Sequence, residues 1–301
     1  MSRRYAFLLL VLGAIWGSSY LFIKVGVRDF EPTVLMTLRL LLGGLILLGF
    51  LAAKDGGGAT LAAVADAWRP GLVVGTINGA VPFTLIAWGE THVDSGVAAI
   101  ANASVPIFVA LLAIKFNPGE RATGLKLVGI LVGLAGVGIL AGVHPEGGGW
   151  AVLGTLAVVL ASLSYAAGGL YGQRALGHAR GPVLATASML YGGLVLLPFA
   201  LFQLPGDAPG WKPVASLLGL AVLGTAVAQL ILFRMLRLFG AARLSLVTYL
   251  IPAFALLYGS LILDEALRPS MLIGLGLILG GVALGSGAWR PLRRPVADSA
   301  A

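Results

Sequence analysis

Apolar runs long enough to cross a lipid bilayer follow one another along almost the whole chain. A spanning helix needs about 20 such residues, and runs such as AVLGTLAVVLASL lack the apolar–polar alternation of a membrane β-barrel strand. Only 11% of the 301 residues are charged and 58% are hydrophobic, whereas a soluble domain carries about 25% charged residues. The sequence therefore predicts an all-α polytopic membrane protein embedded in lipid.

Charged and turn-forming residues divide the chain into ten predicted transmembrane helices. The first apolar run is too long for a signal peptide and no cleavage pattern follows it, so we expect an uncleaved helix. The longest loop begins KDGGGA at Lys54 and is predicted to be a flexible polar connector. The ten expected ranges are 5–25, 33–53, 71–89, 95–115, 124–142, 150–173, 182–203, 214–235, 243–263 and 270–288.

Lysine and arginine residues are unevenly distributed between the two predicted sides. With a cytoplasmic N-terminus, 15 of them fall in inner loops and ends and 4 in outer loops, while Arg39 lies within a span. Positive residues accumulate on the cytoplasmic side of membrane proteins. We therefore predict that both termini are cytoplasmic, and that the net charge of +8 reflects orientation rather than nucleic-acid binding.

The chain also contains an internal repeat. The segment from Leu85, which contains Pro106, aligns with the segment from Leu230, which contains Pro252, at a shift of about 146 residues. Each half would hold five helices, so the second half enters the membrane from the opposite side and the fold is predicted to be two inverted five-helix repeats. Such repeats are typical of secondary transporters, whose substrate site lies at the repeat interface. The predicted units are residues 1–145, 146–290 and a cytoplasmic tail, 291–301.

Several motifs carry a resemblance to a known family. They are GAIWGSSYLFIKVG, Arg39 in TLRLLLGG, the paired proline-to-GE and proline-to-DE segments, and the Gly-rich fifth and tenth helices. In this order the chain resembles the drug/metabolite transporter superfamily, in particular its EamA-type ten-helix exporters. The resemblance implies a central cavity, alternating access, and export of amino acids, or related small metabolites, across a bacterial inner membrane. The second half departs from the family pattern at Ser164-Tyr165, where the first half has a tryptophan-led motif.

The predicted substrate cavity combines aromatic and neutral polar residues. Amides and hydroxyls can hold an amino acid's charged groups, and aromatic faces can hold an apolar side chain or an ammonium group. Lipid contact, core packing and interhelical hydrogen bonding are the structural alternatives. The candidates are Trp16, Tyr20, Asn78, Phe83, Trp88, Asn102, Ser104, Tyr165, Gln229, Thr248 and Tyr249.

Four further residues are predicted to form hinges or a gate. Pro82, Pro106 and Pro252 each remove a backbone donor from a helix, and the last two occupy matching positions in the repeat. Arg39 is the charged residue within a span, where charge is costly and usually functional. It could attract a carboxylate or form a gate, but snorkelling outward or pairing with Asp29 or Glu31 is the favoured interpretation.

Absences limit the function further. No Asp or Glu lies deep within a predicted span, so no proton relay is predicted and antiport of cationic drugs is disfavoured. Three dispersed histidines and no cysteine offer no metal site, and no cofactor is expected. Nucleotide-sugar transport would need several cations for phosphate, and an intramembrane enzyme would need a catalytic set that these spans lack. Both stay as alternatives to a small-molecule exporter that is not an enzyme.

Glycines in the fifth and tenth helices bear on the oligomeric state. Gly129 and Gly133 recur at nearly matching positions as Gly276 and Gly280. Small residues at this spacing let helices approach closely, either within one chain or across a dimer seam. We favour packing within the chain, and hence a monomer over a homodimer.

Thiol labelling can test the inverted repeat, because the chain has no cysteine of its own. Single cysteines at Ser2 and Ala301 should both react only with a reagent admitted to the cytoplasmic side. A cysteine at Asp207, in a predicted outer loop, should react from the other side. Labelling of the two chain ends from opposite sides would contradict the repeat.

Overall fold

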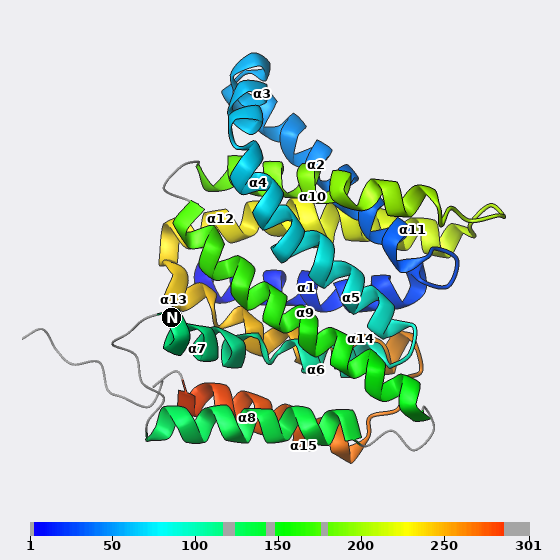
Figure 1. Cartoon of the computed structure of the whole chain (residues 1–301), viewed down its shortest axis with the longest axis vertical. Coiled ribbons are helices and arrows are strands. Elements are labelled where there is room, and N and C mark those ends of the chain that lie inside the picture. Colours follow the sequence, from blue (N-terminus) through cyan, green and yellow to red (C-terminus); the bar gives the residue numbers. More distant parts are fainter. Residues whose placement is uncertain (1–2, 117–123, 143–147, 176–179, 286–301) are drawn as a thin grey trace, which may run out of the picture.

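The computed structural model describes residues 3–116, 124–142, 148–175 and 180–285, and in these ranges every regular element is a helix (Figure 1). Seven spans are long and apolar enough to cross a membrane, and three shorter apolar helices complete the ten predicted spans. The seven are α1 (Arg3–Gly26), α2 (Pro32–Asp55), α4-η1-α5 (Trp68–Gly75, Thr76–Ala80, Val81–Glu90), α6-α7 (Ser95–Asn102, Val105–Phe116), α9 (Gly148–Ala175), α10 (Gly181–Leu201) and α11-η2-α12 (Trp211–Gly219, Leu220–Val227, Ala228–Phe239). The shorter three are α8 (Leu125–Gly142), α14 (Val247–Ile262) and α15 (Pro269–Gly285).

The observed helices confirm the predicted spans to within about one turn. We call the side on which α1 begins, at the left of Figure 1, the N-terminal face. Successive spans alternate in direction, so α1, α5 and α14 all end on the opposite face.

The predicted flexible connector after Lys54 is wrong in part, because it folds into helix α3 (Gly57–Asp66). Val64 of α3 is buried in a small apolar cluster with Leu51 of α2 and Val183 of α10. The three glycines of the loop suggested flexibility, but the following ATLAAVA segment is rich in helix-forming alanine. Packing against two long helices fixes this segment.

Helices α8 and α15 pack against each other along a seam of small residues at one edge of the bundle (Figure 1). A Cβ at Gly281 of α15 would lie 2.6 Å from the nitrogen of Gly133 of α8, so the backbones touch. Gly274 is the other α15 glycine in the seam, whereas Gly276 and Gly280 have no heavy atom within 4 Å. The prediction that Gly276 and Gly280 face α8 is therefore wrong, because the other face of α15 turns toward α8. The contact between the two helices is made within one chain.

The two halves also contact each other through matching positions in α2 and α10. A Cβ at Gly44 would lie 2.8 Å from the Leu190 side chain, and a Cβ at Gly193 would lie 2.7 Å from the Leu41 side chain. Gly44 and Gly193 are as far apart in the sequence as Leu41 and Leu190. The two contacts therefore exchange under a twofold rotation, as in any contact between equivalent surfaces.

Two spans contain π-helical segments, η1 in the third and η2 in the eighth. The register that aligns Pro106 with Pro252 carries η1 into η2, so the two distortions occupy matching positions. π-helical turns are rare and occur often at functional sites. In η1 the carbonyl of Ile77 accepts a hydrogen bond from the Ser164 hydroxyl of α9, at 2.6 Å.

The three predicted hinge prolines have different local settings. Pro106 lies in the first turn of α7, after a break in the helix, where a missing backbone donor costs little. Pro82 comes directly after η1, inside a span that continues from η1 into α5. The helix is interrupted by a turn at Ala103 and Ser104, just before α7. Pro252 lies inside α14, and the corresponding break comes earlier, between α13 (Ala241–Leu244) and α14. A hinge role for these prolines stays a prediction.

Gly75→Ala should destabilise the fold. A Cβ at Gly75 would collide with the carbonyl of Ser188 and lie 2.8 Å from the nitrogen of Gly192, so α4 and α10 would have to separate. Overpacking of this kind costs about 1–3 kcal/mol. Thermal unfolding in detergent measures the effect, with Gly276→Ala as the control in open space. Equal stability of the two variants would contradict this account.

Candidate functional site

Arg39 lies inside the bundle with only 5% of its surface exposed. Its Nε donates to the hydroxyl of Thr225 in η2, at 3.1 Å, and its guanidinium carbon lies 4.0 Å above the centre of the Phe83 ring of α5. The Thr225 hydroxyl in turn donates to the carbonyl of Leu220, a contact that fits the wider π-helical turn. Arg39 thus joins α2 of the first half to η2 of the second.

The favoured expectation that Arg39 snorkels or pairs with an acid is wrong. Within the described residues no carboxylate lies within ion-pair distance of its guanidinium. Asp29, one of the expected partners, accepts a bond from the backbone nitrogen of Gly210 instead. Arg39 lies about two turns from the start of α2, and we expected its long side chain to reach water from there. The side chain instead points to Thr225.

A hydrogen-bonded chain lies beside Arg39 and also crosses between the halves. Asn102, at the end of α6, donates its amide to the Tyr20 hydroxyl of α1, at 2.8 Å. The hydroxyl of Ser162 in α9 lies 3.2 Å from the Asn102 amide oxygen. Two predicted residues therefore meet, and Asn102 is held by α1 and α9 together.

Aromatic rings complete what we call the central cluster. The rings of Phe83 and Tyr165 meet edge to face, with centroids 6.2 Å apart, and Phe83 also carries the Arg39 guanidinium. Phe83, Asn102 and Tyr165 keep partial exposure although they lie between helices. The central cluster consists of Tyr20, Arg39, Phe83, Asn102, Ser162, Tyr165 and Thr225.

Sequence reasoning missed two members of the central cluster, Ser162 and Thr225. Both are small hydroxyl residues within apolar runs, and such residues usually bond the backbone of their own helix. Both do so here as well, to the carbonyls of Val158 and Leu220. Their second contacts depend on tertiary packing, so no local pattern could have identified them.

The other predicted cavity residues have different surroundings. Trp16 packs on the apolar cluster around Leu12 and Met235, near the N-terminal face. Asn78 packs against Gly168 of α9. Gln229 and Thr248 are partly exposed, and the Thr248 hydroxyl bonds the carbonyl of Ser245, one turn earlier. Tyr249 packs on the main apolar core.

Of two further predicted cavity residues, Ser104 needs correction and Trp88 lies away from the central cluster. Ser104 is fully buried and its hydroxyl donates to the carbonyl of Ala101, at 2.6 Å, so it satisfies the broken end of α6 rather than facing an open space. Trp88 lies at the end of α5 and packs on His92, which is also stacked on Trp150. Trp88 therefore lines the opposite face of the bundle rather than its centre.

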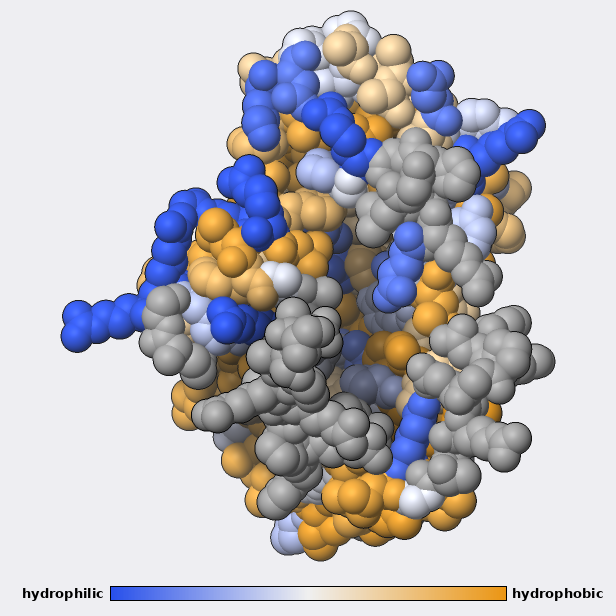
Figure 2. Space-filling model, turned by 90° about the vertical axis from the view of Figure 1, so that its left-hand side faces the viewer, coloured by the Kyte–Doolittle hydropathy of each residue, from blue (hydrophilic) through white to orange (hydrophobic). Residues whose placement is uncertain are grey.

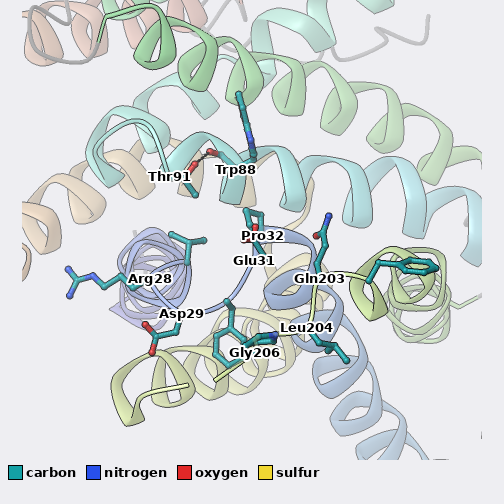
Figure 3. A pocket seen from close by; sticks show the side chains of 13 residues that line it. Arg28, Asp29, Glu31, Pro32, Trp88, Thr91, Gln203, Leu204 and Gly206 are labelled. Carbon is teal, nitrogen blue, oxygen red and sulfur yellow. Dashed lines mark hydrogen bonds between the residues drawn. The ribbon is translucent and has the colours of Figure 1, made fainter. Parts of the chain in front are cut away.

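A cavity of about 790 Å³ opens on the opposite face. Its walls come from the α1–α2 loop, the end of α5 and the α10–α11 loop, and include Arg28, Glu31, Trp88, Thr91 and Gln203 (Figure 3). Acidic, basic and aromatic side chains are mixed in this lining, and no single charge dominates it. We call this cavity the mouth.

Near this mouth, Lys24 joins the end of α1 to the end of α5. The ammonium of Lys24, near the end of α1, donates to the carbonyls of Glu90 and Val93, at 2.7 Å each. Glu90 itself is 0% exposed. The sequence predicts a loop at Glu90, because the preceding span is expected to end at residue 89. The structure buries Glu90 as the last residue of α5.

The N-terminal face is hollowed at its middle, and hydrophilic surface is visible inside the hollow (Figure 2). Polar residues inside an apolar membrane bundle are often functional, and transporters built from repeats place such residues between their halves.

The chain belongs to the EamA-like transporter family, whose model matches residues 3–142 and again residues 152–286. Its relatives include the "uncharacterized inner membrane transporter YedA" of Escherichia coli K12, 29% identical over 92% of this chain and 88% of that protein. Another is the "probable amino-acid metabolite efflux pump" of the same organism, 26% identical over 94% of each chain. A solved crystal structure shares the fold, with a TM-score of 0.66, 18% identity, and coverage of 95% and 97%.

These findings confirm a polytopic membrane protein of the drug/metabolite transporter type. Family and relatives indicate a transporter rather than an enzyme. Among the described residues no group of histidine, aspartate or glutamate side chains could hold a metal ion. His144, His178 and the predicted tail at 291–301 lie outside the described residues.

Thr225→Val should destabilise the protein by about 1.5–3 kcal/mol, the range for a lost hydrogen bond to a charged group. The buried Arg39 guanidinium would lose its oxygen acceptor. Thr76→Val is the matched control, because the Thr76 hydroxyl is exposed and bonds only the carbonyl of Leu72 in its own span. Thermal unfolding in detergent compares the two, and a larger loss in the control would contradict the role of Thr225.

Proposed function

We propose that this chain is a secondary transporter that exports amino acids, with neutral and aromatic ones preferred, by alternating access. The observation that carries the proposal is Arg39, a buried cation without an acidic partner among the described residues. A charge held inside a membrane bundle without a countercharge is costly, so such residues usually serve binding. The free carboxylate of an amino acid supplies the missing countercharge.

The chemistry of Arg39 suits this role. A guanidinium has five donors in a planar fork that matches a carboxylate. The Thr225 hydroxyl takes the Nε donor, and Met36 sulfur lies 4.0 Å from one terminal nitrogen. The remaining donors are available to a ligand. The Phe83 ring below the guanidinium keeps it in place without neutralising it.

The rest of the central cluster supports an amino-acid ligand. Tyr20, Phe83 and Tyr165 offer aromatic surface for an apolar side chain, and an aromatic face also attracts an ammonium group. Asn102 and Ser162 add an amide and a hydroxyl from α6 and α9. Fixed negative charge is not needed, because oxygens of these groups can accept the ammonium protons.

The direction of transport is proposed from charge and shape together. Fifteen basic residues on the predicted inner side make the N-terminal face cytoplasmic. The hollow on that face gives entry from the cytoplasm (Figure 2). Closure around Lys24 on the opposite face supports an inward-open state, and rocking of two inverted repeats, residues 1–145 and 146–290, would expose the central cluster to the other side.

The name of one relative, the probable amino-acid metabolite efflux pump of Escherichia coli, agrees with this substrate class. Nucleotide-sugar transport is the second candidate within the family type. Phosphate groups favour clusters of arginine or lysine, and the central cluster has Arg39 as its single cation. The ammonium of Lys24 is engaged with two backbone carbonyls. The site therefore favours a carboxylate over a diphosphate.

Counterflow in liposomes tests the proposal. Purified protein should exchange internal unlabelled phenylalanine or methionine for labelled amino acid without ATP or an imposed gradient. Arg39→Met should weaken apparent affinity at least about tenfold, because a hydrogen bond to a charged group contributes about 1.5–3 kcal/mol. Asn102→Ala should reduce flux while expression is intact.

Arg180→Gln is the control, since Arg180 is exposed and pairs with Asp55 away from the centre. Exchange of nucleotide sugars but not amino acids would favour the second candidate. Equal flux in the parent, Arg39→Met and Asn102→Ala would remove the central cluster from the substrate site.

A further inference from the structure

Glu90 is an acid that the proposed transport site does not use. It is the last residue of α5 and is completely buried. Neither of its carboxyl oxygens has a hydrogen-bond partner among the described residues. Buried polar atoms are nearly always hydrogen-bonded, so an exception asks for an explanation.

A neighbouring acid shows the opposite behaviour. The carboxylate of Glu265, which follows α14, accepts bonds from the backbone nitrogens of Ser95 and Gly96 and from the Ser95 hydroxyl, at 2.8–3.2 Å. These donors lie at the start of α6, where the helix dipole also favours negative charge. The Glu265 carboxylate therefore has three hydrogen-bond donors, whereas the carboxyl of Glu90, across the same turn, has none among the described residues.

The nearby ammonium does not change this contrast. Lys24 donates to the backbone carbonyl of Glu90, not to its carboxyl oxygens. An ionised carboxylate is acceptor-only and needs donors, and burying it without them costs so much that such groups take up a proton instead. The carboxyl of Glu90 in this conformation is therefore in its neutral form.

Glu90 lies between water on the opposite face and the central cluster. Trp88 and Thr91, its near neighbours in the chain, line the mouth of about 790 Å³ (Figure 3). On the other side, Tyr20 of the central cluster stands one turn before Lys24 on α1. The charged and titratable groups that interact with Glu90 are Lys24 and Tyr20 of α1, Arg39 of α2 and Glu265 after α14.

We propose that Glu90 is a proton-binding site that controls opening of the opposite face. The O–H bond of the Glu90 carboxyl is intact while the end of the bundle is closed. When the end opens, water enters from the mouth, the bond breaks, and the proton passes to that water. The carboxylate is then hydrated, and the Lys24 ammonium offsets its charge. Closure reverses both steps.

A thermodynamic consequence follows from this linkage. Because the closed conformation holds the proton more tightly than the open one, lowering the pH favours closure and raising it favours opening. The inference depends on the proposed function only for the movement between two conformations. Proton binding by Glu90 in the closed form is a property of the chain with or without an identified substrate.

Infrared spectroscopy of the purified, substrate-free protein tests the proton directly. A protonated carboxyl has a C=O stretch separate from the bands of a carboxylate. At neutral pH the parent should show this band, Glu90→Gln should lack it, and Glu31→Gln, which removes an exposed acid of the same mouth, should retain it. Glu90→Asp keeps a carboxyl and should shift the band. A parent spectrum without the band, or an unchanged band in Glu90→Gln, overturns the proposal.

Thiol labelling tests the link to opening, since the chain has no cysteine. Ala87 is 0% exposed and lies one turn before Glu90 on the same side of α5, so opening that hydrates Glu90 should expose a cysteine placed there. Labelling rates of Ala87→Cys are compared in the parent and Glu90→Gln backgrounds at each pH, because this ratio cancels ionisation of the thiol itself. A Glu31→Gln background is the control.

The ratio should increase with pH by up to about tenfold per pH unit, the limit for release of one proton. A ratio that does not change with pH overturns the link. So does a constant ratio of parent to Glu90→Gln rates beside a ratio of Glu31→Gln to Glu90→Gln rates that rises with pH. These measurements need no transported substrate. Failure of amino-acid exchange would therefore count against the proposed function alone, and failure of the infrared result against Glu90 alone. Failure of the labelling result beside an intact infrared result would count against the link between Glu90 and opening.

Discussion

Backbone hydrogen bonding inside hydrocarbon is the constraint on which the rest of this structure depends. Every N–H and C=O that leaves a helix within the membrane must find a partner in the protein. The chain nevertheless interrupts four of its spans, at η1, at η2, before α7 and before α14. Each interruption is accompanied by a polar side chain that bonds the local backbone, from Ser164, Thr225, Ser104 and Thr248 in turn.

Polar side chains that bond the backbone can be told apart from those that keep free donors or acceptors. The hydroxyl of Ser104 and the ammonium of Lys24 are consumed by carbonyls at the ends of α6 and α5, and the Glu265 carboxylate is consumed by the start of α6. Arg39 keeps donors beyond its bond to Thr225, and the carboxyl of Glu90 has no partner among the described residues. Arg39 and Glu90 are thus a cation and an acid whose polar atoms the scaffold does not fully use, at different depths of the same bundle.

The span pattern could be predicted from the sequence because it depends on the length and polarity of local runs, and these set the helix ends to within about a turn. Contacts between spans depend on which helix face turns inward. The glycine seam shows this limit, since Gly276 was expected in it and Gly274 occupies it. Helix α3 was missed because three glycines precede a helix-forming segment.

The sequence predicted the kinds of residue found in the central cluster, but only some of its members. Tyr20, Phe83, Asn102 and Tyr165 meet as aromatic and amide groups, whereas Trp88 and Ser104 do not join them. The acceptor of Arg39 is remote in sequence, and the burial of Glu90 depends on how α1 covers the end of α5. Neither the partner of Arg39 nor the burial of Glu90 can be predicted from a short stretch of sequence, because both depend on contacts between distant helices.

The matching contacts of α2 and α10 have a consequence for how charge can be arranged. Arg39 stands one turn before the glycine pair of α2, and Ser188 stands one turn before the glycine pair of α10. Two separate identical subunits would place a guanidinium at both positions, and these would repel each other across the axis. Joining both copies in one polypeptide lets the halves diverge, so the shared architecture can surround an asymmetric centre with a single positive pole.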